Sequence, residues 1–330
     1  MRGKISFWRL VGALALAVTV LGISGPGWAQ KGKPKPPAAP PDPAIAYSAW
    51  YGALNHVDPM VVNADGSNNR AVLSQKGIVY DWPDWSPDGK QIVTRGGVGT
   101  IGIDIVNVDG TGQTRVIETR DWGPIAWCPV PLGPDLKYKI AFADRAPEEG
   151  RMDHDLYIVN VDGSDLQRMT NTPDVNESPF AGYCNISWSF DGQYIAAAAY
   201  DDVIIYKINC DAGVFTATSL GGIIPYGPLA SEIMEIDWAN TQNKLVIMAG
   251  WYDLYVVDVF NPSNIVQLTA TSIREMGPSW SPDDSQIAYI NGGLGVWVMN
   301  ADGSGAHRIV APQTRVIYER TQWRRNILPQ

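Results

Sequence analysis

Short apolar stretches recur along the chain, separated by turns rich in Pro, Asp and Gly. After residue 30, no stretch keeps the 3.6-residue period of an amphipathic helix. The apolar stretches therefore predict β-strands rather than helices. The clearest are residues 91–95, 139–143, 194–199, 244–249 and 286–290.

A repeat built on tryptophan organises these strands. Residues 84–89 read DWSPDG, which returns as SWSPDD at 279–284 and SWSFDG at 187–192, and weaker copies keep the tryptophan. The six repeat tryptophans are Trp85, Trp127, Trp188, Trp238, Trp280 and Trp323, spaced by 42, 61, 50, 42 and 43 residues. A period of about 40 to 50 residues is typical of a four-stranded propeller blade. Extra segments at 129–138 and 145–154 account for the longest spacing.

Each tryptophan is followed by the same order of elements. A Pro-Asp-Gly type turn leads to an apolar strand, a loop and a third strand such as 156–160 or 296–300. An Asp-Gly turn, which is a strong hairpin signal, then leads to a short outer strand such as 115–117 or 307–310. We therefore predict an all-β fold, a six-bladed β-propeller of four-stranded antiparallel blades.

The two ends of the repeat region complement each other. Segments 44–49, 60–64 and 70–74 match the second, third and fourth strands of a blade that lacks its tryptophan strand, and 320–324 supplies one. We predict that the C-terminal strand joins the N-terminal blade and closes the ring, which removes free strand edges.

The repeat units at 85–92 and 61–67 look like those of the TolB propeller family, and the same repeat occurs in propellers of prolyl-oligopeptidase-like enzymes. The resemblance extends over nearly all of the chain after residue 43. It implies a periplasmic protein whose propeller docks another protein. TolB has an additional α/β domain before its propeller, whereas here we expect only a tether.

The N-terminal region predicts export. Residues 1–29 combine a basic start, an apolar run and small residues before Gln30, which is typical of a signal peptide. Residues 30–43 are rich in Pro and Lys and predict an extended linker, so the propeller spans 44–330. We expect a periplasmic or secreted monomer that does not span the membrane once the leader is cleaved. The net charge of −9 argues against nucleic-acid binding.

Motifs that carry chemistry are weak in this sequence. Residues 97–102 spell the glycine fingerprint of dinucleotide-binding loops, but a strand is predicted where that site needs a helix. We expect a hairpin loop there and no cofactor. No Gly-x-Ser-x-Gly elbow, His-Glu-x-x-His pair or phosphate-binding loop occurs, so we expect no enzyme.

The histidines and cysteines leave alternatives open. His56 and His154, beside Asp58 and two other aspartates, are expected to be exposed loop residues, with a metal or acid–base site as the alternative. We therefore predict no metal site. The three cysteines match no metal or redox spacing, and we expect buried thiols, with one disulfide plus one thiol as the alternative.

Aromatic and charged residues gather in the loops that precede the tryptophan strands and follow the second strands. Loops held by a rigid scaffold often carry binding residues. The predicted partner-binding residues are Asp81, Trp82, Asp121, Trp122, Glu177, Trp251, Arg274, Glu275, Glu319 and Arg320. The alternative is that several of them pack beneath the loops. The repeat tryptophans are expected to pack between neighbouring sheets.

These features favour a protein- or peptide-binding module of the bacterial cell envelope. The alternative is a propeller enzyme that acts on a carbohydrate or phosphate ester through carboxylates at the channel mouth. A structural unit of a cell-surface assembly, tethered through residues 31–43, is a third hypothesis. Fold alone does not decide among them.

Overall fold

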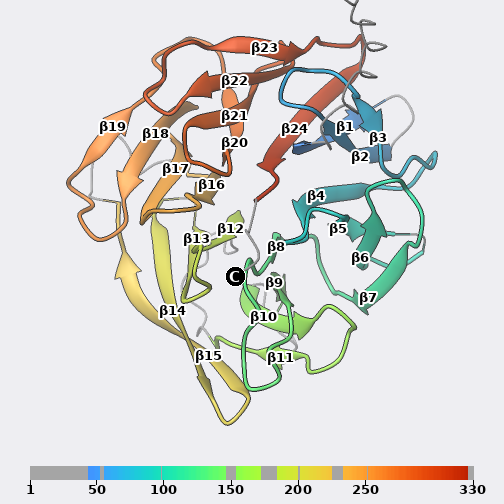
Figure 1. The fold of residues 1–330 in the computed structure, drawn as a ribbon, viewed down its shortest axis with the longest axis vertical. Helices are drawn as coiled ribbons and strands as arrows, with labels where there is room; N and C mark the ends of the chain where they lie inside the picture. Colours follow the sequence, from blue (N-terminus) through green and yellow to red (C-terminus); the bar gives the residue numbers. More distant parts are fainter. Residues whose placement is uncertain are drawn as a thin grey trace, which may run out of the picture. The chain divides into compact units, whose positions relative to one another are not determined.

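The computed structural model describes residues 44–52, 56–97, 99–145, 154–171, 184–199, 201–224, 233–250 and 252–325. Within these ranges the chain forms six four-stranded antiparallel sheets. The sheets are arranged as blades around a common centre (Figure 1). The predicted six-bladed propeller is therefore confirmed.

The second and third strands of each blade, counted from the centre, carry most of the core. The innermost strands are β24 (Val316–Trp323), β4 (Tyr80–Trp85), β8 (Ile125–Trp127), β12 (Asn185–Trp188), β16 (Glu235–Trp238) and β20 (Glu275–Trp280). The second strands are β1 (Ile45–Tyr51), β5 (Gln91–Gly96), β9 (Lys139–Arg145), β13 (Tyr194–Ala198), β17 (Lys244–Ala249) and β21 (Gln286–Asn291). Both faces of a second strand lie against neighbouring blades, so sequences such as KLVIMA are almost continuously apolar and buried.

The third strands are largely buried, and the outermost strands are the most exposed part of each blade. The third strands are β2 (His56–Val62), β6 (Gly102–Asn107), β10 (His154–Asn160), β14 (Val203–Asp211), β18 (Asp253–Asp258) and β22 (Val296–Asn300). The outermost strands are β3 (Arg70–Ala71), β7 (Thr114–Glu118), β11 (Gln167–Arg168), β15 (Val214–Gly222), β19 (Ile265–Gln267) and β23 (His307–Val310). Blades are numbered 1 to 6 from the blade that contains β1.

The ring closes through the C-terminal strand, as predicted. β24 pairs with β1 from Ile45↔Trp323 to Tyr51↔Val316, so blade 1 contains strands from both ends of the described chain. The pairing begins earlier than the sequence predicted, at Val316 rather than residue 320. Closure leaves no unpaired innermost or second strand among the described residues.

The Ser-Pro-Asp-Gly turn after each strong copy of the repeat is held by its own side chains. Ser86 Oγ donates to Asp88 Oδ1 at 2.7 Å and accepts from Gln91 N at 2.9 Å. The same two bonds recur from Ser189 and from Ser281. These bonds fix the turn from the innermost to the second strand, which explains why the motif recurs.

Two sequence expectations in the outer strands are wrong. β2 begins at His56 rather than residue 60, because pairing with β1 overrides the unfavourable propensity of Asp58 and Pro59. His56 and His154 are therefore the first residues of strands, not loop residues. His56 is buried, stacks on Tyr51 at 4.7 Å between ring centroids and lies 3.6 Å from Asp58.

The cysteines agree with expectation in part: they form no disulfide with one another, but they are not all buried. Cys128 is a buried free thiol, as expected, and burial raises its pKa to about 12. Cys210 is exposed in the hairpin of β14 and β15. That hairpin is longer than its counterparts and packs Phe215 against the extra loop 129–138, so its tip extends beyond the shorter blades.

Candidate functional site

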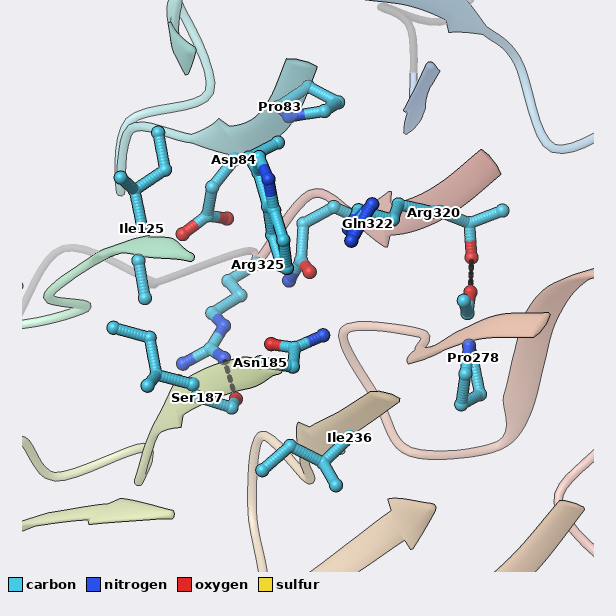
Figure 2. A pocket seen from close by; sticks show the side chains of 15 residues that line it. Pro83, Asp84, Ile125, Asn185, Ser187, Ile236, Pro278, Arg320, Gln322 and Arg325 are labelled. Atoms are coloured by element: carbon cyan, nitrogen blue, oxygen red, sulfur yellow. Dashed lines mark hydrogen bonds between the residues drawn. The ribbon is translucent and has the colours of Figure 1, made fainter. Parts of the chain in front are cut away.

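The centre of the propeller is a narrow channel lined by all six innermost strands. Figure 2 shows the cavity there, whose volume is about 30 Å³. A cavity of this size holds one or two water molecules. Its lining mixes apolar side chains such as Ile125 and Ile236 with polar ones such as Asn185 and Gln322.

Arg325 lies across this channel. It follows β24 and reaches across the channel from blade 1 to blades 4 and 5 (Figure 2). Its guanidinium donates to Trp188 O at 3.2 Å and to Ser187 Oγ at 3.3 Å, and it pairs with Asp237 Oδ1 at 3.3 Å. The residue therefore links the C-terminal end of the ring to the opposite blades.

Two buried carboxylates face the same centre. Burial raises the pKa of Asp84 to about 6 and raises that of Asp237, while the positive charge of Arg325 opposes both shifts. Asp84 accepts from the backbone N–H groups of Trp85 and Trp127 at 2.7 and 2.6 Å. Both carboxylates are thus buried with hydrogen-bond donors, as buried charges must be.

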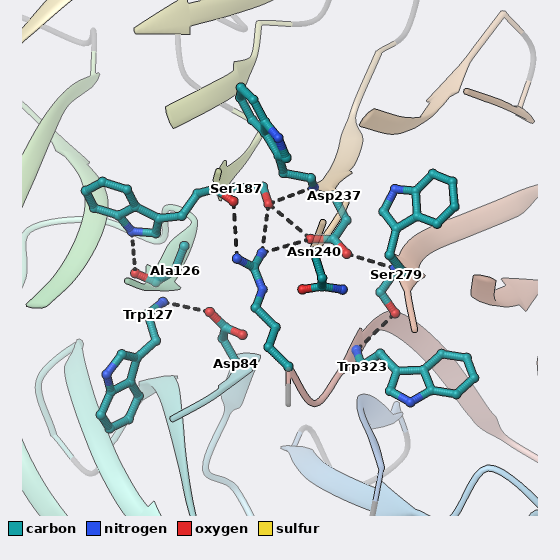
Figure 3. A network of polar contacts seen from close by, with 12 residues as sticks. Asp84, Ala126, Trp127, Ser187, Asp237, Asn240, Ser279 and Trp323 are labelled. Atoms are coloured by element: carbon teal, nitrogen blue, oxygen red, sulfur yellow. Dashed lines mark hydrogen bonds and ion pairs between the residues drawn. The ribbon is translucent and has the colours of Figure 1, made fainter. Parts of the chain in front are cut away.

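A belt of hydrogen bonds joins neighbouring blades at the level of the repeat tryptophans. The residue before a tryptophan accepts from the backbone N–H of the tryptophan in the next blade (Figure 3). The acceptors are Asp84 to Trp127, Ser187 to Trp238, Asp237 to Trp280 and Ser279 to Trp323. Ala126 and Gln322 accept instead through their backbone oxygens, from the indole N–H groups of Trp188 and Trp85.

The six indole rings themselves are buried between blades. Trp127, for example, packs among Val93 and Ile103 of blade 2 and Ile140 of blade 3. The repeat position thus serves packing and interblade hydrogen bonding, not a ligand cage.

We call the face on which the innermost strands begin the mouth face. Three adjacent innermost strands carry a bulge there, at Trp82, Gly277 and Arg320, each with a positive φ. Glycine is required at 277, because a Cβ atom would lie 2.5 Å from Arg320 Cα. The other two bulges aim large side chains at the channel opening, which straight strands would not do.

At this opening the structure brings four predicted residues together. The Arg320 guanidinium lies over the Trp82 ring at 3.3 Å from its centroid, and its Nη1 is 3.6 Å from Asp81. Asp81 also accepts from Ser48 Oγ at 2.6 Å. Glu319 is the fourth, and the charges of Asp81 and Arg320 both act on it.

Two further residues extend the same opening. Glu235 is buried and accepts from the backbone N–H of Gly277. Arg274 is exposed and lies over the Tyr252 ring at 4.2 Å from its centroid. We call Asp81, Trp82, Glu235, Glu319 and Arg320 the mouth cluster.

Trp122 is presented separately, at the tip of the loop before β8, where its side chain is 43% exposed. The loop is held from below by Asp144, which accepts from the backbone N–H groups of Arg120 and Asp121 at 2.9 to 3.1 Å. Arg95 is fully buried and donates to Gly123 O and Ala143 O at 2.8 Å. Burial lowers the pKa of Arg95 to about 10, so it stays charged at neutral pH.

Asp121, the residue before Trp122, is also fixed. It pairs with Arg145 at 2.5 Å, lies 3.6 Å from His154 Nε2 and accepts from the Trp122 N–H at 2.8 Å. The side chains of this loop therefore hold Trp122 in place and leave its ring exposed.

Glu275 is placed differently from the other predicted residues. Its side chain is only 1% exposed and accepts from Thr271 and Thr269 at 2.6 and 3.2 Å. Burial raises its pKa. Glu275 thus holds the 269–275 loop and is not available to a partner. Glu177 and Trp251 lie outside the described residues.

Arg325 and the pair Arg95–Asp144 were not predicted from the sequence. A signal for Arg325 was present, because Asp84 and Asp237 stand at a repeat position whose tryptophan neighbours are buried. Two buried carboxylates call for a nearby cation. No comparable signal marked Arg95, whose partner lies in the next blade.

The glycine run at 97–102 leads into a strand, and the candidate metal residues form no metal-binding group in the described ranges. β6 begins at Gly102, and the Arg115 guanidinium fills the space beside Gly97 and Gly102. Across the described ranges, no group of three or more His, Cys, Asp or Glu side chains could hold a metal ion. In the same ranges, no helix is long and apolar enough to cross a membrane.

Known structures share this architecture. The chain aligns with TolB from Acinetobacter baumannii at a TM-score of 0.64 and 18% identity, over 86% of this chain and 67% of that one. A putative TolB from Agrobacterium tumefaciens aligns at 0.55 and 16%, over 85% and 98%. A chain of a nidogen–laminin complex aligns at 0.63 and 11%, over 86% and 98%.

No family model and no curated protein sequence matches the chain. At identities this low, the likeness is one of fold. The resemblance to TolB propellers is confirmed at that level: the chain has the six-bladed propeller fold that these TolB structures share.

Proposed function

We propose that this propeller is exported and binds a protein or peptide of the bacterial cell envelope on its mouth face, without catalysing a reaction. The observation that carries the proposal is the way Trp122 is presented. An aromatic ring that is 43% exposed stands on a loop fixed by a buried ion pair, Arg95–Asp144, at 3.3 Å.

The buried Arg95–Asp144 pair beneath this loop is better explained by a binding role of the exposed Trp122 ring than by a gain in stability. A buried arginine and its carboxylate lose much of their hydration, so they are weak contributors to stability. Here they order a loop whose tip contacts solvent. A pre-ordered loop lowers the entropy lost on binding, and tryptophan is enriched among residues that dominate interface energies.

The channel supports docking on the face rather than a substrate bound inside. Its cavity measures about 30 Å³, and Arg325 lines it. Pockets for small-molecule ligands are typically roughly tenfold larger or more. A partner would therefore meet the loops and the mouth cluster first.

The structural neighbours are consistent with this role. One of them is a chain in a complex of nidogen with laminin, which is a complex between two proteins. TolB propellers share the fold, and the resemblance in the repeats implies a periplasmic docking protein. These likenesses motivate the envelope location that we propose.

Site-specific photocrosslinking in living cells tests the binding face. A photoreactive phenylalanine analogue at position 122 should form a covalent adduct with one defined protein. The matched control is position 138, whose tyrosine is 38% exposed on the opposite face. Adducts of equal yield and identity from both positions, or none from 122, would contradict the proposal.

Export is tested independently. Alkaline phosphatase folds to an active form only where disulfides form, so a fusion after residue 43 should be active in whole cells. A fusion that lacks residues 1–29 should be inactive. Equal activity of the two fusions would remove the envelope location but not the binding face.

A further inference from the structure

The carboxylates of the mouth cluster differ in how they are satisfied. Asp81 accepts from Ser48 Oγ and from the Trp82 N–H at 2.6 and 2.7 Å, and Glu235 accepts from the Gly277 N–H. The carboxylate of Glu319, by contrast, makes no hydrogen bond and no ion pair with any described residue, although its backbone is paired with β1. One carboxylate at the channel opening is thus unpaired.

Its surroundings make this unfavourable for the folded protein. Glu319 is half-buried in blade 1, and the negative charges of Asp81 in blade 2 and Glu235 in blade 5 act on it. Burial, followed by the charge of Asp81, raises its pKa. Burial and two neighbouring carboxylates destabilise the charged form of a glutamate unless a cation comes close to it.

The two nearby arginines do not fill that place. Arg320 is stacked on Trp82 and directed at Asp81, and Arg274 is stacked on Tyr252 with its Nη2 at 3.9 Å from Met234 Sδ. Their charges reach Glu319, but neither guanidinium forms an ion pair with it. Aromatic stacking holds each guanidinium where it is.

We propose that Glu319 binds a lysine or arginine side chain of the partner protein at the channel opening. The proposal rests on the proposed function and names the chemistry of the partner. Glu319 lies on β24 before Trp323 and Arg325, on the side of the mouth face, so a side chain of the partner would reach it from that face. The net charge of −9 steers basic segments towards the chain.

A peptide selection tests this chemistry directly. A random heptapeptide library on phage is panned against the full-length chain, purified as the cell exports it. Peptides are kept if Trp122→Ala weakens their binding. The kept peptides should share a Lys or Arg at one position, and their affinity should fall as NaCl is raised.

Glu319→Gln should weaken these peptides at least tenfold, and so should replacement of their basic residue by norleucine. The two changes together should cost little more than either alone, because they remove the same contact. Glu118→Gln is the matched control, since Glu118 is exposed on the outermost strand of blade 2. A cooperative thermal unfolding transition of Glu319→Gln serves as the control that the variant is folded.

The outcomes separate this inference from the proposed function. Peptides that depend on Trp122 but share no basic residue, or that bind Glu319→Gln as tightly as the original chain, would overturn the inference alone. A selection that yields no peptide dependent on Trp122 would overturn both.

Discussion

The tryptophan belt and the mouth cluster lie on the same innermost strands, yet their carboxylates differ in how they are hydrogen-bonded. In the belt, Asp84 and Asp237 each accept from a tryptophan N–H of the next blade, and Arg325 lies near both. In the mouth cluster, Glu319 has no bonded partner among the described residues, and the strands bulge. The contrast is between carboxylates: those of the belt have backbone donors and a nearby arginine, whereas the carboxylate of Glu319 has no such bond. Bulged backbone and perturbed titratable groups gather at functional sites more often than elsewhere.

The difference extends along each strand. β24 holds Trp323 in the belt at one end and Glu319 near the opening at the other. The positive φ of Arg320 separates the two regions. The ring can hold an unfavourable opening because the belt below it is bonded from blade to blade. Changes that break the belt should therefore cost more stability than changes at the opening.

The largest effect is expected from Asp237→Ala. The change leaves the Arg325 guanidinium without its ion-pair partner and the Trp280 N–H without its acceptor. Breaking a buried pair on one side costs about 3 to 5 kcal/mol of unfolding free energy. Urea denaturation measures the loss. Asp201→Ala, at an exposed position, is the control, and an equal midpoint for both variants would contradict the role of the belt.

The pH dependence of stability should be next in size. A carboxyl whose pKa is raised on folding holds its proton more tightly when folded, so its contribution is present at low pH and is lost as pH rises. For Asp84 the window runs from 3.8, its ordinary pKa, to about 6. The unfolding free energy should fall by roughly 2 to 3 kcal/mol between these values.

Denaturant titrations from pH 4 to pH 8 check this fall. Asp84→Asn removes the titrating group and should flatten the curve, although it also costs a hydrogen bond to a tryptophan N–H. A curve of the same slope in the variant would show that other groups cause the pH dependence.

A smaller loss is expected from Ser279→Ala. Ser279 Oγ accepts from the Trp323 N–H at 3.1 Å and so joins blade 6 to the closing strand. Its removal leaves a buried donor unpaired, which costs about 1 to 2 kcal/mol. The Tm measures the loss, and Ser285→Ala in an exposed turn is the control. No difference between the two variants would mean that the belt adds nothing at closure.

The smallest effect has the opposite sign. Glu319→Gln removes a charge whose pKa is raised by burial and by Asp81, so stability at pH 7 should rise by less than about 1 kcal/mol. The same variant is expected to bind worse. A fall in Tm at pH 7 would show that Glu319 stabilises the opening rather than weakening it.

The sequence alone determined the fold, because its evidence is local and repeated. The six tryptophans and their Ser-Pro-Asp turns report strand, turn and strand from adjacent residues. Even ring closure could be predicted, since one blade lacked a tryptophan strand and the C-terminal end carried a tryptophan strand that belonged to no other blade. The candidate loops were located for the same reason.

The tertiary structure alone decided how the candidate residues behave. Asp81, Glu235 and Glu319 come from three different blades, and no local pattern shows that their charges meet. Glu275 and Glu319 both stand in innermost strands, yet one is buried under threonine hydroxyls and the other has no bonded partner in the described ranges. Arg325 crosses to blades 4 and 5, more than 80 residues away in sequence from Asp237. Burial and charge depend on contacts between distant segments, so they follow from the closed ring and not from the repeat.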